Sequence, residues 1–392
     1  MVVRKRRGIR RRLIVLASAG GAIADLTRGV WRSESGHRWL LPLAVFLCVF
    51  GLVLILATTV EALAPFIYAI FCAGMDAFRE LLACPVCADP LSSRWVCGGC
   101  GARFDADEGI PNLRLPCSDR TEAVRRFYER APFPGYPPRD TLHALRVRAE
   151  RSVFARLLDR AIAADARVAE IGCGTGQMSL YLARADRIVV GADLARASLR
   201  LAAAAARRFA IDRVQFVEAD LQRPGLKARS FDVVYSAGVV HHTANPRAAF
   251  ARLAQLARPG GTIVVGVYNA FARIPSRLRR TVARASGFTV IPFDPVLRDR
   301  QRDPARREAW LRDQYQHPEE HSHTLAEVQR WFAENDLEFF RAYPSSVFGD
   351  EPDDLFTPAA DNWSVEAWLA QLGWMRTLGR EGGLFYAIGR RR

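Results

Sequence analysis

The chain has 392 residues, which is longer than one average domain and predicts two or more structural units. Its formal net charge is +15, from 56 Lys and Arg residues against 41 Asp and Glu residues. Nearly all of the basic residues are arginine, so the charge reflects composition as much as a binding surface. The charge alone therefore does not identify a nucleic-acid-binding protein.

The first 38 residues (1–38) form a basic tail. Up to Arg38 the chain holds ten Lys and Arg residues, whereas the acidic residues there are Asp25 and Glu34. Eight of the fifteen excess positive charges therefore lie in this tail. Charge concentrated in this way can contact anionic lipid or nucleic acid.

Residues 39–78 are predicted to form a membrane segment. Leu40 to Val60 is uncharged and apolar, and it is long enough for a transmembrane helix of ~20 residues. After Glu61, a second apolar stretch runs from Ala62 to Ala77. This pattern predicts either one long crossing or a hairpin of two short helices, and the arginines before Trp39 predict a cytoplasmic N-terminus.

Residues 80–116 carry two Cys-x-x-Cys pairs that are separated by nine residues. Four thiolates at this spacing form a tetrahedral site that usually holds Zn²⁺. Disulfides are disfavoured because a cytoplasmic chain keeps its thiols reduced. We therefore predict a structural zinc ribbon, with a ribbon that contacts substrate as the alternative. The predicted metal ligands are Cys84, Cys87, Cys97 and Cys100.

Residues 120–162 are predicted to link the ribbon to the next domain. Between Arg125 and Pro138 there are four prolines, which forbid a regular helix past Ala131. The aromatic residues of the same stretch need a surface on which to bury.

The stretch from Arg167 to Gln177 organises the rest of the chain. It is predicted to be a strand, a tight turn and a helix N-terminus, and its glycines let backbone lie against a ligand. A dinucleotide-binding turn needs its third glycine one residue later, where Gln177 stands. The next strand, Arg187 to Ala192, ends at Asp193, whose carboxylate can accept hydrogen bonds from ribose hydroxyls. The sequence therefore favours adenosine binding over pyrophosphate binding.

Alternating helices and strands follow, as expected for an α/β fold. Helices are predicted at Ser179 to Ala185, Ala195 to Ala210, Pro246 to Ala257 and, after the capping box at Thr324, up to Asn335. Further strands are predicted at Val214 to Val217, Phe231 to Ser236, Thr262 to Tyr268 (after a turn at Pro259 to Gly261), Leu337 to Tyr343 and Leu384 to Ile388.

The segment 269–323 interrupts this alternation. Within it Arg277, Arg280 and Arg284 share one face at helical spacing. A basic amphipathic helix can lie on an anionic membrane, bind nucleic acid, or simply be solvated. A solvated face is the simplest of these three interpretations. A membrane tether elsewhere in the chain favours the interpretation that the helix lies on an anionic membrane.

Five motifs together resemble a known family. "VAEIGCGTG", "GADL", "VEADL", "FDVVYSAGVVHH" and "LARPGGTIVVGVYN" occur in the order and spacing of class I S-adenosylmethionine-dependent methyltransferases of the type 11 kind. The resemblance covers roughly Ala163 to Gly389 and implies a methyltransferase domain at 163–392. It also implies a doubly wound, Rossmann-like sheet of seven strands whose last strand pair is antiparallel. The ribbon resembles that of the ribosomal-RNA guanine methyltransferases.

The resemblance also implies roles for individual residues. Glu170 is expected to hold the methionine end of the cofactor, Asp193 the ribose, and Asp220 the adenine amino group. Leu194 is expected to cover the adenine ring. The remaining predicted cofactor-binding residues are Gly172, Gly174, Gly176, Gln177, Leu221 and Ser236.

The acceptor side of the site is expected to come from three regions. By the same resemblance, the linker caps the pocket, so Tyr128, Phe133 and Tyr136 are lid candidates, and the insertion 269–323 shapes the acceptor pocket. His242 and Tyr268 are candidates for contact with the acceptor. His241 is the catalytic candidate, because a histidine with a pKa near 6.5 can remove a proton from an attacking atom. A structural role for His241 is the alternative.

The cofactor requirement bears on the membrane topology. A single crossing would export the methyltransferase domain away from its cofactor. A cleaved signal peptide after Arg11-Arg12 would do the same. We therefore favour a hairpin or a re-entrant segment. The sequence therefore predicts an enzyme anchored at the cytoplasmic face of the cell membrane. It would methylate a small or lipid-linked acceptor there, with membrane lipid as a partner.

Two other functions remain open. An RNA base is the alternative acceptor, although no Asn-Pro-Pro-Phe/Tyr motif follows the fourth strand. The second alternative is a non-catalytic partner subunit that binds S-adenosylmethionine, and the intact glycine turn weighs against it.

Overall fold

The computed structural model describes residues 46, 50, 77–133, 135–136, 140–294, 296–297, 304–317, 319–360, 364–379 and 382–392. The chain divides into two compact units, Met1–Ala73 and Gly74–Arg392. The predicted basic tail lies outside the described residues, as does nearly all of the predicted membrane segment. In the described part of the chain, no helix has both the length and the apolar character that a membrane crossing needs.

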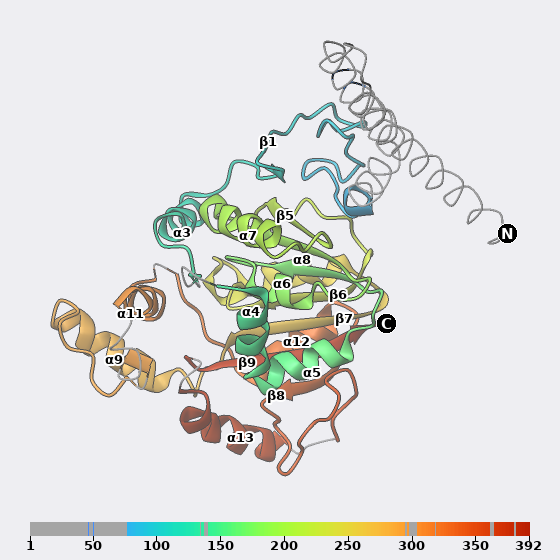
Figure 1. Ribbon diagram of the computed structural model, residues 1–392. Helices are drawn as coiled ribbons and strands as arrows, with labels where there is room; N and C mark the ends of the chain where they lie inside the picture. Colours follow the sequence, from blue (N-terminus) through green and yellow to red (C-terminus); the bar gives the residue numbers. More distant parts are fainter. Residues whose placement is uncertain are drawn as a thin grey trace, which may run out of the picture. The chain divides into compact units, whose positions relative to one another are not determined.

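A seven-stranded mixed sheet forms the centre of the second unit (Figure 1). Its strand order is β5-β4-β3-β6-β7-β9-β8, and the first five of these strands are parallel. Strand β9 is antiparallel to both β7 and β8. The predicted doubly wound sheet with an antiparallel last strand pair is therefore confirmed. The strands are β3 (Arg167–Ile171), β4 (Ile188–Asp193), β5 (Val214–Glu218), β6 (Phe231–Ala237), β7 (Ala257–Tyr268), β8 (Leu337–Tyr343) and β9 (Leu384–Arg391).

Helices cover both faces of this sheet because its central strands are apolar on both sides. In β3, Val168 packs into the core that contains α5 and α7, whereas Ala169 packs into the core that contains α8 and α12. The helices are α3 (Asp119–Arg130), α4 (Leu142–Glu150), α5 (Val153–Ala161), α6 (Gln177–Leu182), α7 (Arg196–Arg208), α8 (Pro246–Leu256), α9 (Ile274–Ala285), α11 (Pro304–Leu311), α12 (Leu325–Glu334) and α13 (Ser364–Thr377), with a 3-10 turn η2 (Val240–His242) and a π-helical turn η3 (Arg312–Gln316).

The cysteine-rich segment docks on the edge of the sheet. It contains a small hairpin of β1 (Ala106–Asp107) and β2 (Ile110–Pro111). Directly after the hairpin, the Leu113 N–H donates to the carbonyl of Glu218 at the end of β5, at 2.8 Å. This contact covers part of an edge strand and places the ribbon segment next to the carboxyl end of the sheet.

Two predicted boundaries are wrong. The predicted turn at Pro259 to Gly261 lies inside β7, which begins at Ala257 and changes register against β6 between Phe231 and Val233. The helix expected from Ser179 to Ala185 is observed at Gln177–Leu182, because it begins directly after Gly176. The insertion 269–323 does leave the sheet, as predicted, and forms α9, α11 and η3.

Candidate active site

The turn after β3 requires glycine at two positions for steric reasons. Gly172 has φ +75°, and a Cβ there would come within 2.0 Å of the Val239 side chain. Gly174 has φ +53°, and a Cβ there would lie 2.5 Å from the carbonyl oxygen of Phe133. The backbone at Gly174 therefore packs closely against the backbone of Phe133. Because neither glycine has a side chain, a ligand can also approach the backbone of this turn closely.

Asp193 at the end of β4 holds this turn in place. Its Oδ2 accepts a hydrogen bond from the Gly174 N–H at 2.8 Å, and its Oδ1 accepts one from the Ala195 N–H at 2.8 Å. Burial raises the pKa of Asp193, while these backbone N–H groups oppose the rise. The carboxylate thus orients both the glycine turn and the start of α7, and its remaining lone pairs are available to ribose hydroxyls.

Glu170 lies in β3 on the wall of the same cavity and is only 5% exposed. Burial raises its pKa to about 8, and the hydroxyl of Ser179 donates to its Oε2. In the unliganded protein this carboxyl therefore holds a proton at neutral pH. A ligand cation, such as an ammonium group, would favour the ionised form.

Both carboxylates line one cavity of about 790 Å³. This volume lies in the upper part of the range of small-molecule sites, ~300–1,000 Å³. Most of the predicted cofactor-binding residues line it, namely Glu170, Gly172, Gly174, Gln177, Asp193, Leu194, Asp220 and Leu221. Gly176 does not line it, because this glycine faces Ala202 and Phe216 in the core. Ser236 is also absent from the wall, because it is buried and donates to the carbonyl of Ile171.

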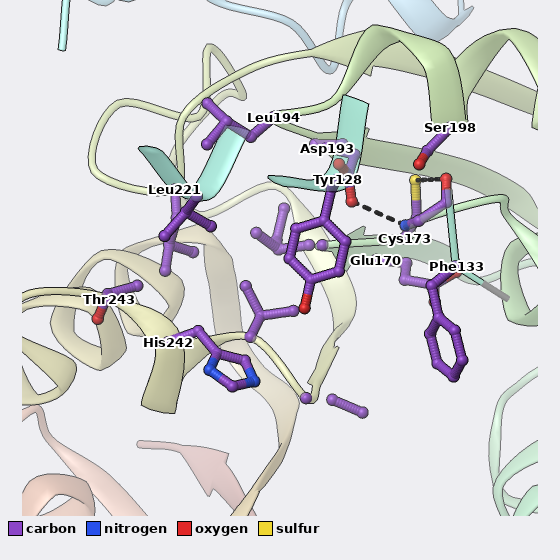
Figure 2. Close-up of a pocket in the computed structure, with 18 of the residues that line it drawn as sticks. Tyr128, Phe133, Glu170, Cys173, Asp193, Leu194, Ser198, Leu221, His242 and Thr243 are labelled. Atoms are coloured by element: carbon purple, nitrogen blue, oxygen red, sulfur yellow. Dashed lines mark hydrogen bonds between the residues drawn. The ribbon is translucent and has the colours of Figure 1, made fainter. Parts of the chain in front are cut away.

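The predicted lid covers this cavity. Tyr128 and Phe133 line it, and the Tyr128 hydroxyl donates to Asp313 Oδ1 of η3 at 3.0 Å. Tyr136 is not on the wall, but its hydroxyl donates to the carbonyl of Thr175 at 2.5 Å and so ties the lid to the glycine turn. Figure 2 shows the Tyr128 ring lying between Asp193 and His242.

The carboxylate of Glu129 anchors the lid helix α3 on α7. It accepts hydrogen bonds from the backbone N–H groups of Arg196 and Ala197 at 2.8 and 3.1 Å. These are unpaired donors of the first turn of α7, where a negative charge is also stabilised by the helix dipole. No sequence pattern predicts this anchor, because Glu129 lies 67 residues from its partner.

His242 lines the cavity, whereas the catalytic candidate His241 does not. His241 is fully buried against Tyr268, with ring centroids 3.9 Å apart, and neither ring nitrogen has a hydrogen-bond partner among the described residues. His242 Nδ1 lies 2.7 Å from the carbonyl oxygen of Glu319, so Nδ1 carries the proton and Nε2 the lone pair. Burial lowers the pKa of His242 to about 4, which keeps the ring neutral.

The insertion supplies the wall beyond His242. Trp310, Asp313 and Gln314 line the cavity together with the predicted Tyr268. The Gln314 side chain donates to the Tyr268 hydroxyl at 2.8 Å. The acceptor pocket was predicted in this segment, but none of these three residues was predicted to line it, because the sequence around them lacks a periodic pattern that would show which side chains face inward.

Arg273 supports that wall from behind. Its guanidinium is 1% exposed, lies 4.0 Å from the centre of the Tyr268 ring, and donates to Glu320 and to the carbonyl of Gly382. A buried arginine with this many partners fixes the orientation of the aromatic ring over which it lies.

The four predicted metal ligands converge on one point. The Cys87 and Cys97 sulfurs are 3.3 Å apart, and those of Cys84 and Cys100 are 3.7 Å apart. All four ligand atoms lie within 4.8 Å of one another, and no other such group occurs among the described residues. Four converging thiols fit Zn²⁺ by charge and by ligand softness.

Comparisons with known proteins agree with this geometry. Residues 169–265 match a family model described as a methyltransferase domain, and residues 24–71 match a family of unknown function. The chain is 32% identical over 182 residues to a ubiquinone biosynthesis O-methyltransferase of Xanthomonas axonopodis pv. citri, covering 45% of this chain and 71% of that protein.

Other relatives are matched over less of their length. An uncharacterized protein of Synechococcus is 26% identical over 58% of this chain, and the chain spans 63% of that protein. An uncharacterized methyltransferase of Mycobacterium tuberculosis is 36% identical over 25% of this chain, which spans 48% of that protein. A geranyl diphosphate C-methyltransferase from Streptomyces coelicolor overlaps 71% of this chain and 100% of its own, with 13% identity and a TM-score of 0.42.

Proposed function

Because this chain belongs to the S-adenosylmethionine-dependent class I methyltransferases, we propose that it transfers a methyl group to a small or lipid-linked acceptor at a membrane surface. The observation that carries this proposal is the single cavity that runs from Asp193 to His242 and Trp310. One end has the carboxylates that a cationic nucleoside cofactor needs. The other end, under the lid, has room for a second molecule.

The aromatic part of the cavity wall favours an acceptor with an apolar or aromatic body. Phe154, Tyr235 and Tyr386 line it, with the rings of Phe154 and Tyr386 stacked 3.6 Å apart. Side chains of this kind bind flat apolar groups, whereas a charged polynucleotide would need exposed cations along its path. The similarity to a ubiquinone biosynthesis O-methyltransferase also supports an acceptor of this class.

His242 is the group that would contact the reacting atom. Its Nε2 lone pair can accept a hydrogen bond from an acceptor hydroxyl and take the proton as the methyl group is transferred. The cofactor supplies an activated methyl group. The chain supplies alignment, because Asp193 and Glu170 fix the donor while the lid and the insertion wall fix the acceptor.

We also propose that the cysteine cluster holds one structural Zn²⁺, and that the chain is anchored at the cytoplasmic face of the cell membrane. The cluster geometry supports the first statement. The second is supported by the apolar stretch from Leu40 to Val60 and by the basic residues that precede it.

The proposed activity can be tested with full-length protein in detergent. The protein is incubated with methyl-labelled S-adenosylmethionine and, in separate tubes, with a lipid extract, a water-soluble metabolite fraction and total RNA. Label in the lipid or metabolite fraction, identified by mass spectrometry, is the expected result. Label in RNA alone would contradict the proposed acceptor class, and cofactor binding without any product would favour a non-catalytic subunit.

A further inference from the structure

The outer side of the insertion carries exposed apolar residues at helical spacing. On α9 these are Ile274, Leu278 and Val282, which recur every four residues and are 39%, 65% and 43% exposed. Val290 and Phe293, in the loop after α9, are 54% and 84% exposed. We call these five residues the α9 face. Side chains of this size in one stretch of surface indicate a contact with something apolar.

Arginines flank the α9 face. Between Phe271 and Phe293 the sequence has five arginines and no acidic residue. Arg280 is turned inward and pairs with Glu320 at 3.1 Å. Arg277 and Arg284 are exposed, and their seven-residue spacing places them together on one side of the apolar stripe, with Arg277 three residues after Ile274.

The inner side of the same lobe forms the acceptor end of the cavity. Val296, Leu297, Trp310 and Tyr315 form a small core of their own, against which Phe288 packs. Trp310 also lines the cavity. Figure 1 shows α9 and α11 together, away from the strands of the sheet. The loop after α9 and the cavity wall at Trp310 therefore share one small core.

We propose that the α9 face lies on the surface of a lipid bilayer that contains anionic headgroups. The apolar residues would enter the acyl-chain boundary, and Arg277 and Arg284 would lie among the headgroups, which is the arrangement of interfacial amphipathic helices. Docking by this face would bring the acceptor end of the cavity to the bilayer. The inference deepens the proposed function and rests on it only for the source of the acceptor.

Other occupants fit the α9 face less well. A second copy of this chain in a two-fold contact would bring two basic patches together, with no acidic residue between Phe271 and Phe293 to offset their charge. A nucleic acid would neutralise the arginines but leave the most exposed residues, Phe293 and Leu278, without an apolar partner. An anionic bilayer satisfies both the charge and the apolar stripe.

Vesicle binding as such does not test this inference, because the N-terminal apolar stretch can bind vesicles by itself. The readout must therefore report on the α9 face in the full-length protein. Phe293 is replaced by the photoreactive residue benzoylphenylalanine, and the protein is illuminated on vesicles of phosphatidylcholine with phosphatidylglycerol, or of phosphatidylcholine alone. The matched control carries the same residue at Leu201 of α7, which is 42% exposed.

A lipid adduct at position 293, several-fold more abundant with phosphatidylglycerol and several-fold above that at position 201, is the expected result. Arg277→Gln combined with Arg284→Gln should reduce the adduct several-fold without changing the affinity for S-adenosylmethionine. Arg252→Gln combined with Arg330→Gln, two exposed arginines on α8 and α12, should leave the adduct unchanged.

A covalently linked dimer, or no lipid adduct at position 293, would overturn the inference. The labelled-product experiment separates this failure from failure of the proposed function. A methylated lipid without an adduct would show that the α9 face does not dock on the bilayer, although the protein has the proposed activity. An adduct without label in either the lipid or the metabolite fraction keeps the docking face and contradicts the proposed acceptor class.

Discussion

Two buried carboxylates on neighbouring strands set the chemistry of the cofactor end. Asp193 is already held by backbone N–H groups, so its position is fixed before any ligand arrives. Glu170 has one hydroxyl donor and a raised pKa, so its charge depends on the ligand. In the proposed function, the first carboxylate would preorganise the site, and the second would link cofactor binding to proton release.

Cofactor affinity should therefore depend on pH through Glu170. Its pKa rises from an ordinary 4.5 to about 8 in the folded protein, so a cationic cofactor that needs the carboxylate must expel a proton at lower pH. Affinity measured by calorimetry should rise by up to about tenfold per pH unit between pH 6 and 7.5, below the pKa of the cofactor's own amino group. Glu170→Gln should remove this dependence. An unchanged slope in that variant would assign the proton to another group.

The raised pKa of Glu170 also makes the stability of the folded protein depend on pH. The direction is opposite to that of cofactor affinity, because stability falls as the pH rises. The unfolded chain loses the Glu170 proton near pH 4.5, whereas the folded, unliganded protein keeps it up to about pH 8. The folded state binds more protons across this window, so this group's contribution to stability falls as the pH rises through it.

His242 should affect turnover more than binding. If its Nε2 takes the acceptor proton, His242→Gln should lower kcat by about 10²-fold or more and leave cofactor affinity unchanged. Because burial lowers its pKa to about 4, the acidic limb of kcat should lie well below pH 6.5. His143→Gln, on the exposed side of α4, is the matched control. A wild-type kcat in His242→Gln would leave His242 as part of the pocket wall only.

At the residue scale, motif resemblance identified the cofactor end better than the acceptor end. Asp193 and Glu170 lie in the last two residues of strands whose ends are fixed by the sheet, so their place could be predicted. His241 and His242 are adjacent in a 3-10 turn, and the sequence does not show which of two neighbours turns toward the cavity. Asp313 meets Tyr128 across 185 residues, a contact that only tertiary packing determines.

At the scale of elements, the ribbon and the sheet support each other. Glu218 at the end of β5 accepts a backbone hydrogen bond from Leu113 and ion pairs with Arg114 and Arg196 at 3.3 and 2.5 Å. Asp220, which lines the cavity, lies two residues further on. Loss of order in the ribbon should therefore reach the adenine end of the site.

The protein should contain one zinc ion per chain, measured by elemental analysis after purification without chelator. Cys97→Ser should lose the metal and expose the ribbon to trypsin at Arg94 and Arg103, because a structural zinc site contributes directly to folding. Cys117→Ser is the matched control, since this cysteine lies outside the cluster. Protein without zinc that still resists trypsin at these arginines would show that the four thiols need no metal.

Element types could be predicted where a pattern persisted over a whole strand or helix. The helix start predicted at Thr324 is confirmed, since its hydroxyl accepts from the Glu327 N–H at 3.2 Å, but the Glu327 carboxylate lies 2.8 Å from His323 Nδ1, so only the N-cap half of the predicted capping box is shown. The predicted turn at Pro259 to Gly261 failed because proline and glycine also occur at irregularities within strands. The sequence pattern does not distinguish these two uses.

At the scale of the whole molecule, the class of fold followed from the order of motifs along the chain. The parallel strands β3 to β7 end at one edge of the sheet, and residues at those ends line the cavity. The acceptor end could not be predicted in the same way, because it is assembled from the linker and the insertion, which lie far apart in sequence. The topology of the N-terminal region remains a prediction from sequence alone.

Two physical rules determine that topology. By the positive-inside rule, the charge before Trp39 predicts a cytoplasmic N-terminus, and the cofactor requirement predicts that Glu170 and Asp193 lie in the cytoplasm as well. The N-terminus and the cofactor site lie on the same side only if the chain crosses the membrane an even number of times or enters it without crossing. Glu61 lies where a helix that starts at Trp39 would already leave the hydrocarbon, and a charged side chain is far less costly there than at the bilayer centre.

Reporter fusions after Arg79 test this prediction in cells. A fluorescent protein that matures only in the cytoplasm should be bright, and an alkaline phosphatase that is active only outside should be inactive. The matched control is the same pair of reporters fused after Val60, where a hairpin places the junction at the outer surface and the two signals should reverse. Phosphatase activity after Arg79 would mean a single crossing, and the methyltransferase domain would then lie on the side of the membrane without its cofactor.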